Sequence, residues 1–106
     1  MIFLNRGVRF KIREVPNVIK AIRSTFGSKL GFRGELHGAT LQEYTLILIG
    51  ADQSKPQRAK TLLHEAIHVV LPSMSEQDVR RLEEGLYPLL RRCGFTYPSK
   101  LLEAGG

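Results

Sequence analysis

The chain has 106 residues, which is enough for one small domain spanning 1–106 and too few for a second core. Its composition, with 42% hydrophobic and 25% charged residues, excludes a disordered or fibrous protein, and its net charge of +6 allows acidic or nucleic-acid partners. No apolar run reaches the 18 or so residues that cross a bilayer, and residues 1–6 are too short and too quickly charged for a signal peptide, so we expect a cytoplasmic protein with no membrane partner.

The first quarter of the chain predicts a strand followed by a helix. Apolar and polar residues alternate over residues 8–15, which is typical of a strand with one buried face, and Pro16 ends the pattern. Apolar residues then recur at roughly helical spacing over residues 18–26, and Gly27 is a suitable helix end.

Glycines interrupt residues 31–44, which fits a bent strand or a hairpin better than a helix. The β-rich apolar run 44–49 ends at Gly50 and predicts another strand. We therefore expect a short sheet of three or four strands, in an α+β fold with the helices that follow.

A helix is expected from about residue 56 to residue 71, because Ser54 can cap it and Pro56 suits its first turn. One side of this helix is apolar and consists of Ala59, Leu62, Leu63, Ala66, Ile67 and Val70. His64 and His68 lie on another side of the same helix, about 120° and 160° from the centre of the apolar stripe.

A second helix is expected to begin after Ser75 and to end at Gly94, with Pro88 as a possible site of a kink. Its apolar side consists of Val79, Leu82, Leu86, Leu89, Leu90 and Cys93. The short connection between the two helices predicts an antiparallel hairpin. Cys93, the only cysteine, is expected to be half-buried, and residues 95–98 are expected to fold back onto the domain.

The sequence His64-Glu65-x-x-His68 carries the most definite chemistry in the chain. Residues four apart lie on the same side of a helix, so both imidazoles can bind one Zn²⁺. Zinc lowers the pKa of water towards about 7, and Glu65 would take the proton and pass it to the leaving amine. The pattern therefore predicts a zinc-dependent peptidase with Glu65 as catalytic residue. A pair of surface histidines is the plainer alternative, but apolar residues surround the motif on both sides.

A catalytic zinc needs a third protein ligand, and the chain lacks the further histidine of the longer metalloprotease pattern. The acids Glu76, Asp78 and Glu83 in the next helix are within reach. Glu76 and Glu83 lie on the same flank of that helix, about 10 Å apart along its axis, and helical geometry alone does not choose between them.

Three polar side chains are candidates for oxyanion or substrate contacts, namely His37, Tyr44 and Tyr87. Each of them also has an ordinary structural explanation. A strand beside the zinc helix could in addition hold an extended substrate by pairing along its edge.

Residues 61–68 (Thr-Leu-Leu-His-Glu-Ala-Ile-His), the strands before them and the pattern Glu76-x-x-Val79-x-x-Leu82-Glu83-x-x-Leu86 together resemble the ImmA/IrrE family of zincin-like metallopeptidases. The similarity is greatest to small phage and prophage members, and it covers roughly residues 44–90. It implies a zincin-like fold, with the sheet packed on the zinc helix, and Glu76 as third ligand. It also implies a narrow protein target, such as a repressor or another phage or host protein. The chain departs from the family at Glu83, where alanine is usual, and in its short distance from His68 to the third ligand.

The alternative function is a basic binding module that keeps a structural or vestigial metal site and contacts nucleic acid or a protein. The Lys and Arg residues are dispersed along the sequence, which is typical of a solvated surface. We therefore expect a protein or peptide substrate as the main partner and nucleic acid as a secondary one.

Overall fold

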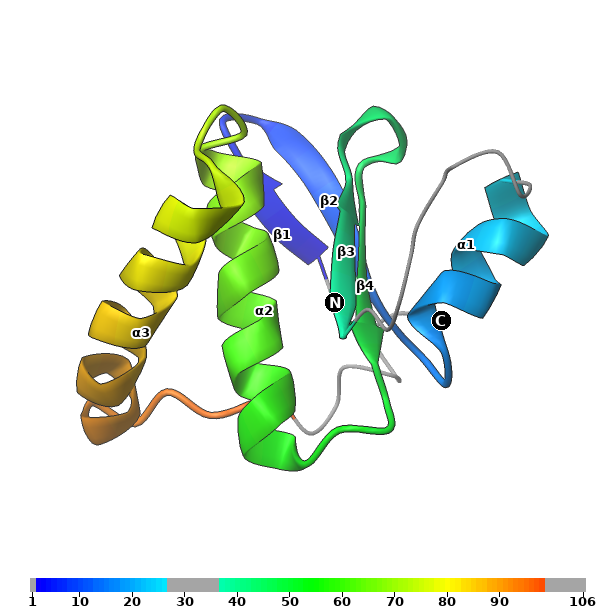
Figure 1. The fold of residues 1–106 in the computed structure, drawn as a ribbon. Helices are drawn as coiled ribbons and strands as arrows, with labels where there is room; N and C mark the ends of the chain where they lie inside the picture. Colours follow the sequence, from blue (N-terminus) through cyan, green and yellow to red (C-terminus); the bar gives the residue numbers. More distant parts are fainter. Residues whose placement is uncertain (1, 27–36, 99–106) are drawn as a thin grey trace.

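The computed structural model describes residues 2–26 and 37–98, which form a four-stranded mixed sheet with helices on both sides (Figure 1). The strand order is β1-β2-β4-β3, with β2 and β4 parallel and the two outer pairs antiparallel. The elements are β1 (Ile2–Asn5), β2 (Val8–Val15), α1 (Val18–Phe26), β3 (Gly38–Leu41), β4 (Leu46–Gly50), α2 (Lys55–Val70) and α3 (Glu76–Arg92). The expected α+β fold, with a short sheet packed on the histidine-bearing helix, is confirmed.

The strand β1 was not predicted from the sequence. Arg6 and Gly7 connect it to β2 in a two-residue turn with φ angles of 50° and 81°, which is the backbone conformation that tight hairpins prefer. Phe3 pairs with Phe10, and both aromatic side chains pack on the α2 side of the sheet. The usual signal for such a turn is Asn-Gly or Asp-Gly, so Arg-Gly gave no indication of the hairpin.

The segment 31–44, expected to be a bent strand or a hairpin, contains the strand β3 in the part that the structure describes, and the separately expected strand is β4. β3 pairs antiparallel with β4 through a short 3-10 turn, Gln42–Tyr44, while Gly31 and Gly34 lie outside the described residues. Thr45, in the left-handed conformation, ends the turn, so β4 begins at Leu46 and not at Tyr44.

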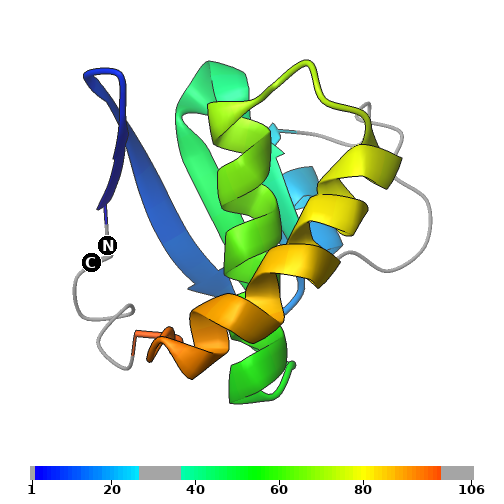
Figure 2. The same cartoon turned by 90° about the vertical axis from the view of Figure 1, so that its left-hand side faces the viewer.

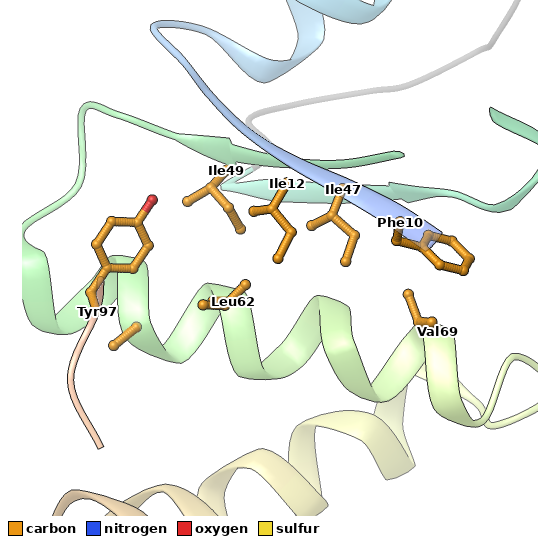
Figure 3. Packing of buried hydrophobic residues seen from close by; sticks show 8 residues of the cluster. Phe10, Ile12, Ile47, Ile49, Leu62, Val69 and Tyr97 are labelled. Atoms are coloured by element: carbon orange, nitrogen blue, oxygen red, sulfur yellow. The ribbon is translucent and has the colours of Figure 1, made fainter. Parts of the chain in front are cut away.

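The main core lies between α2 and the sheet (Figure 3). Ile12, Ile47 and Ile49 project from β2 and β4 and are at most 1% exposed. Leu62 and Val69 meet them from α2. A smaller cluster on the opposite side of the sheet joins α1 to β3 and β4, and its members are Val18, Ile22, Ala39 and Leu48.

The predicted apolar stripe of α2 differs from the buried one. Val70 is 47% exposed, whereas Val69 and the charged Glu65 are buried. This shift arises because α2 lies between two neighbours, the sheet and α3 (Figures 1 and 2). Leu62 and Val69 face the sheet, while Ile67 is buried elsewhere on the helix, so burial does not follow a single stripe.

The helix α3 contacts α2 and lies outside it, away from the sheet (Figure 2). Much of its apolar side is therefore in solvent. Of this helix only Val79 is buried, and Leu86 and Leu89 are exposed. Cys93 is also exposed, so the expectation of a half-buried cysteine was wrong. The helix continues past Pro88 to Arg92. No helix within residues 2–26 and 37–98 combines the length and apolar character that crossing a bilayer requires.

The segment after α3 folds back as expected and is held by a buried polar group. The Tyr97 hydroxyl donates to Glu14 Oε2 at 2.6 Å, and Arg58 Nη1 donates to Glu14 Oε1 at 3.0 Å. The Arg58 guanidinium also lies 5.2 Å from the centre of the Tyr97 ring. One carboxylate therefore joins β2, α2 and the segment that follows α3.

Replacing Tyr97 with Phe should lower the unfolding free energy by about 1.5–3 kcal/mol at neutral pH, because a hydrogen bond to a charged, buried acceptor is lost. Burial, and then the hydrogen bond to Glu14, raise the pKa of Tyr97 far above its ordinary value of 10.0. A phenol with a raised pKa in the folded state stabilises the fold below about pH 10 and loses that contribution as the pH rises further. Urea unfolding at neutral and at alkaline pH measures both effects. If the Tyr97→Phe protein loses as much unfolding free energy between neutral and alkaline pH as the parent does, the Tyr97 phenol is not the cause of the alkaline loss.

Candidate metal centre

The two histidines of the motif meet on one side of α2. His64 and His68 are one helical turn apart, and their Nε2 atoms lie 3.3 Å from each other. Their side chains are 14% and 23% exposed, so each ring is largely packed by protein while its Nε2 atom faces the other. Two nitrogen ligands are therefore presented to the same point.

Glu76, at the first position of α3, completes a group of three. Its Oε1 lies 2.7 Å from His64 Nε2 and its Oε2 lies 2.9 Å from His68 Nε2. Partial burial raises the pKa of Glu76, but the charges of both histidines and their hydrogen bonds outweigh this effect, and the net pKa is lowered. Ser75 fixes the start of the helix because its Oγ accepts from the Asp78 amide at 3.2 Å.

This donor set fits zinc. The three ligand atoms all lie within 4.8 Å of one another. Ligands about 2.1 Å from a tetrahedral zinc are separated by about 3.4 Å, which is close to the 3.3 Å between the two nitrogens. The shorter distances from Glu76 to the imidazoles are those of hydrogen bonds, so only a small outward shift of the carboxylate separates this geometry from a zinc site. Two histidines and one glutamate are a known catalytic ligand set that leaves a position open.

Glu83 is placed behind His64 and outside this group. Its Oε1 lies 2.9 Å from His64 Nδ1, the ring nitrogen opposite the one that faces Glu76, and Lys60 Nζ lies 3.9 Å from its Oε2. An ionised carboxylate only accepts hydrogen bonds, so Nδ1 of His64 donates to Glu83. In a neutral His64 this arrangement would leave the lone pair on Nε2, where it could bind a metal. The structure thus brings Glu76 together with the histidines and gives Glu83 the position of a carboxylate that orients a ligand.

Glu65 is buried beside the histidines, with 6% of its surface exposed. Thr40, from β3, places its hydroxyl 2.9 Å from Glu65 Oε1 and 3.1 Å from the Glu65 carbonyl oxygen. Burial raises the pKa of Glu65, and the Thr40 hydrogen bond and the charges of the two histidines offset part of this rise. A carboxylate with a raised pKa is better suited to taking up a proton.

Two hollows that both border His64 and Glu65 form what we call the histidine cleft. Their volumes are about 310 and 320 Å³, and both are lined by Gly38, His64 and Glu65. The first extends to Glu76 and the second to Glu83. β3 therefore forms one wall of the cleft and α3 the other.

The close contact between β3 and α2 at the cleft requires the glycine at position 38. A Cβ on Gly38 would lie 2.5 Å from Thr61 Cγ2 and 3.1 Å from Glu65 Cγ. Gly38→Ala should therefore lower the unfolding free energy by about 1–3 kcal/mol. Gly85→Ala is the matched control: its Cβ would meet nothing within 4 Å, and alanine inside helix α3 should stabilise by about 0.5–1 kcal/mol. Urea unfolding of both variants tests the contact, which is refuted if Gly38→Ala is as stable as the parent.

The three expected oxyanion or substrate contacts lie in different places. His37 lines the histidine cleft and is exposed. Tyr44 lies in the turn after β3 and lines neither hollow of the cleft. The Tyr87 hydroxyl donates to the Pro56 carbonyl at 3.3 Å, and its ring packs edge-on against Phe95. This position supports a structural role for Tyr87 and no contact with a reacting group.

Several residues that shape the site were missed from the sequence. Gln42 Nε2 donates to the His68 carbonyl at 2.9 Å, and Arg80 Nε lies 3.6 Å from Glu76 Oε1. Arg80 could have been found, because it lies four residues after Glu76 on one helix. Gln42 and Thr40 contact α2 from elements some 25 residues away in sequence, and no local pattern marks them.

Comparisons with known proteins give no relative, because no family model, no curated protein and no solved structure matches the chain. The resemblance to the ImmA/IrrE family therefore stays a prediction. The site itself combines two imidazoles and a carboxylate at one point, a buried carboxylate beside them, and a cleft that borders both.

Proposed function

We propose that this protein is a zinc-dependent peptidase of the ImmA/IrrE type. The observation that carries the proposal is the convergence of His64 Nε2, His68 Nε2 and the Glu76 carboxylate beside the buried Glu65. A structural zinc site would be closed by four protein ligands, and only three are within reach here among the described residues. This donor set therefore favours a catalytic site over a structural one.

Each residue of the site has one task in this reaction. Zinc, when bound, supplies Lewis acidity, which activates water and polarises the scissile carbonyl. His64, His68 and Glu76 hold the metal, and Glu83 keeps the proton on His64 Nδ1. Glu65 accepts the proton from the attacking water and transfers it to the leaving amine.

The position of Glu65 suits a proton carrier. Its hydrogen bond from Thr40 anchors one oxygen to β3 and fixes the side chain in the cleft. Burial raises its pKa, which favours uptake of the proton. The Thr40 hydrogen bond and the charges of the two histidines lower the pKa in part, so the rise from burial is smaller than it would be without them.

An extended peptide is the substrate that the cleft favours. β3 pairs with β4 on one side only and, among the described strands, lies at one end of the sheet, next to the histidine cleft. A peptide that pairs along the outer side of β3 would pass directly over Glu65 and the histidines. We propose a narrow protein target that offers such an extended segment.

The first test is the metal itself. The purified chain should bind one zinc ion, and free zinc at 100 times the dissociation constant should stabilise the fold by about 2.7 kcal/mol. For a domain near this size that corresponds to a rise in Tm of roughly 10–20 °C. Metal analysis and thermal unfolding with and without zinc measure both quantities.

His64→Ala combined with His68→Ala is the matched control, and this variant should show neither stoichiometric zinc nor the rise in Tm. A parent protein without zinc, and without stabilisation by zinc, would refute the proposal. Cleavage is then sought by mass spectrometry after incubation with a peptide library. If zinc binds but no product depends on zinc, the site is structural or vestigial, and the alternative function as a binding module gains support.

A further inference from the structure

Charge is distributed unevenly along the chain. Residues 1–26 contain six basic residues and one acid, which is a net charge of +5 out of +6 for the whole chain. The single acid, Glu14, points towards α2, where Arg58 and Tyr97 bind its carboxylate and leave 6% of the side chain exposed. Its charge is therefore neutralised inside the fold, and the exposed side chains of this segment carry positive charge alone. Such an asymmetry is typical of proteins that bind a polyanion.

Three of these basic residues share one side of β2. Phe10 and Ile12 are buried against α2. Arg9, Lys11 and Arg13 alternate with them, so they project from the opposite side of the sheet, and all three are exposed. Alternate residues of a strand are about 6.6 Å apart, so the three charges span about 13 Å in a line.

The neighbouring strand β1 extends this surface. Ile2 pairs with Lys11 and Leu4 pairs with Arg9, which places the two aliphatic side chains on the same side as the cations. Ile2 is 53% and Leu4 is 65% exposed. We call these five residues, Ile2, Leu4, Arg9, Lys11 and Arg13, the basic face.

The helix α1 covers only the other half of this side of the sheet. It lies on the side of the sheet opposite α2 (Figure 1). It packs through Val18 and Ile22 onto Ala39 of β3 and Leu48 of β4. Among the described elements, none packs over the basic face, as the exposure of all five of its side chains shows. The basic face is thus a surface open to a partner, on the far side of the sheet from the histidine cleft.

We propose that the basic face binds the phosphate backbone of a nucleic-acid duplex. A duplex presents closely spaced phosphates, and each cation that neutralises one gains free energy from counterion release. The face has three evenly spaced cations and no acid among its five residues. Backbone contacts carry no sequence information, so the binding is independent of sequence.

Two other polyanionic partners match the face less well. Single-stranded nucleic acid is held largely by stacking on aromatic side chains, and none of the five residues of the face is aromatic. A membrane surface needs a broad apolar face to insert, and here two half-exposed aliphatic side chains stand beside three cations. The phosphate backbone of a duplex needs only the line of cations.

The test measures binding of the whole protein to a fluorescein-labelled 20-bp DNA duplex by anisotropy, over a series of salt concentrations. The variant Arg9→Gln, Lys11→Gln, Arg13→Gln removes the three cations of the face. The charge-matched control is Arg81→Gln, Arg91→Gln, Arg92→Gln, which removes three exposed cations from α3. At about 0.9 per phosphate contact, the slope of log affinity against log salt should become less steep by about 2.7 in the first variant and stay unchanged in the control.

An equal decrease of the salt slope in both triple variants would overturn the proposal, because the net charge of the protein and not the basic face would then be the cause of duplex binding. No measurable duplex binding by the parent at low salt would also overturn it. Parallel titrations with phosphatidylserine vesicles and with an acidic peptide decide between partners. If either one binds more strongly than the duplex through the same three residues, the proposal that the partner is a duplex is overturned. If the triple variant does not fold, each single substitution should still reduce the slope by about 0.9.

Discussion

Replacing Glu65 with Gln should reduce peptide hydrolysis by about 10²–10⁴-fold while the protein keeps its zinc. Gln has the same shape and can still accept the hydrogen bond that Thr40 donates to Glu65 Oε1 at 2.9 Å. It cannot take up a proton from water, so the loss is expected in kcat and not in metal content. Steady-state kinetics with the best peptide of the library, together with metal analysis of the same preparation, measure both.

The matched control for this prediction is Glu84→Gln, which removes one negative charge from an exposed acid that lines the outer part of the same cleft. It should leave kcat within about twofold of the parent, because solvent and salt largely screen the charge of an exposed side chain. If Glu65→Gln cleaves as fast as the parent, Glu65 has no part in proton transfer. The kcat of Thr40→Val should lie between those of Glu65→Gln and Glu84→Gln, because Glu65 loses the hydrogen bond that fixes it and keeps its carboxylate.

The parts of the fold that could be predicted from the sequence are those whose signal is local. Helix α2 and its two histidines follow from spacings of three and four residues and from a cap and a proline at its start. The hairpin of β1 and β2 was missed because its turn, Arg6–Gly7, lacks the residues that usually mark one. The buried stripe of α2 was displaced because two neighbours and not one cover the helix, and a helical wheel contains no information on the number of neighbours.

Only the part of the site that lies on helix α2 could be predicted from the sequence. Glu65 was identified from its place in the motif, yet its burial depends on β3, whose Thr40 and Gly38 lie some 25 residues earlier in the chain. The basic face is a similar case. Its cations look dispersed in the sequence, but strand alternation places all three on one side of β2, and a neutralising contact removes the single acid from the surface.

The choice between Glu76 and Glu83 shows why helical geometry was insufficient. Both acids lie on the flank of α3 that faces α2, two turns apart. The two nitrogens of one imidazole also point in opposite directions. His64 therefore contacts both acids at once, Glu76 through Nε2 and Glu83 through Nδ1. Which acid would meet a bound metal depends on which nitrogen of His64 faces His68, and the packing of α3 on α2 decides this.

Removal of Glu76 should weaken zinc binding more than removal of Glu83. Glu76→Ala takes away one of three ligands, and we expect a loss of affinity of more than 100-fold. Glu83→Ala removes only the acceptor that fixes His64, and such outer carboxylates contribute about 10–100-fold. Competition with a chromophoric chelator measures the affinity of each variant. Glu83→Gln should recover most of the loss, because its amide oxygen still accepts from Nδ1 of His64.

Glu84→Ala serves as the control for both variants, since it removes the same charge from the adjacent, exposed position on α3. Unfolding in the absence of zinc separates metal binding from stability, because Glu76 also lies near Arg80 and in the first turn of the helix, where its charge contributes about 0.3–1 kcal/mol. A larger loss of zinc affinity in Glu83→Ala than in Glu76→Ala would make Glu83 the third ligand. It would also mean that α3 shifts along α2 when the metal binds, because Glu83 now lies on the far nitrogen of His64.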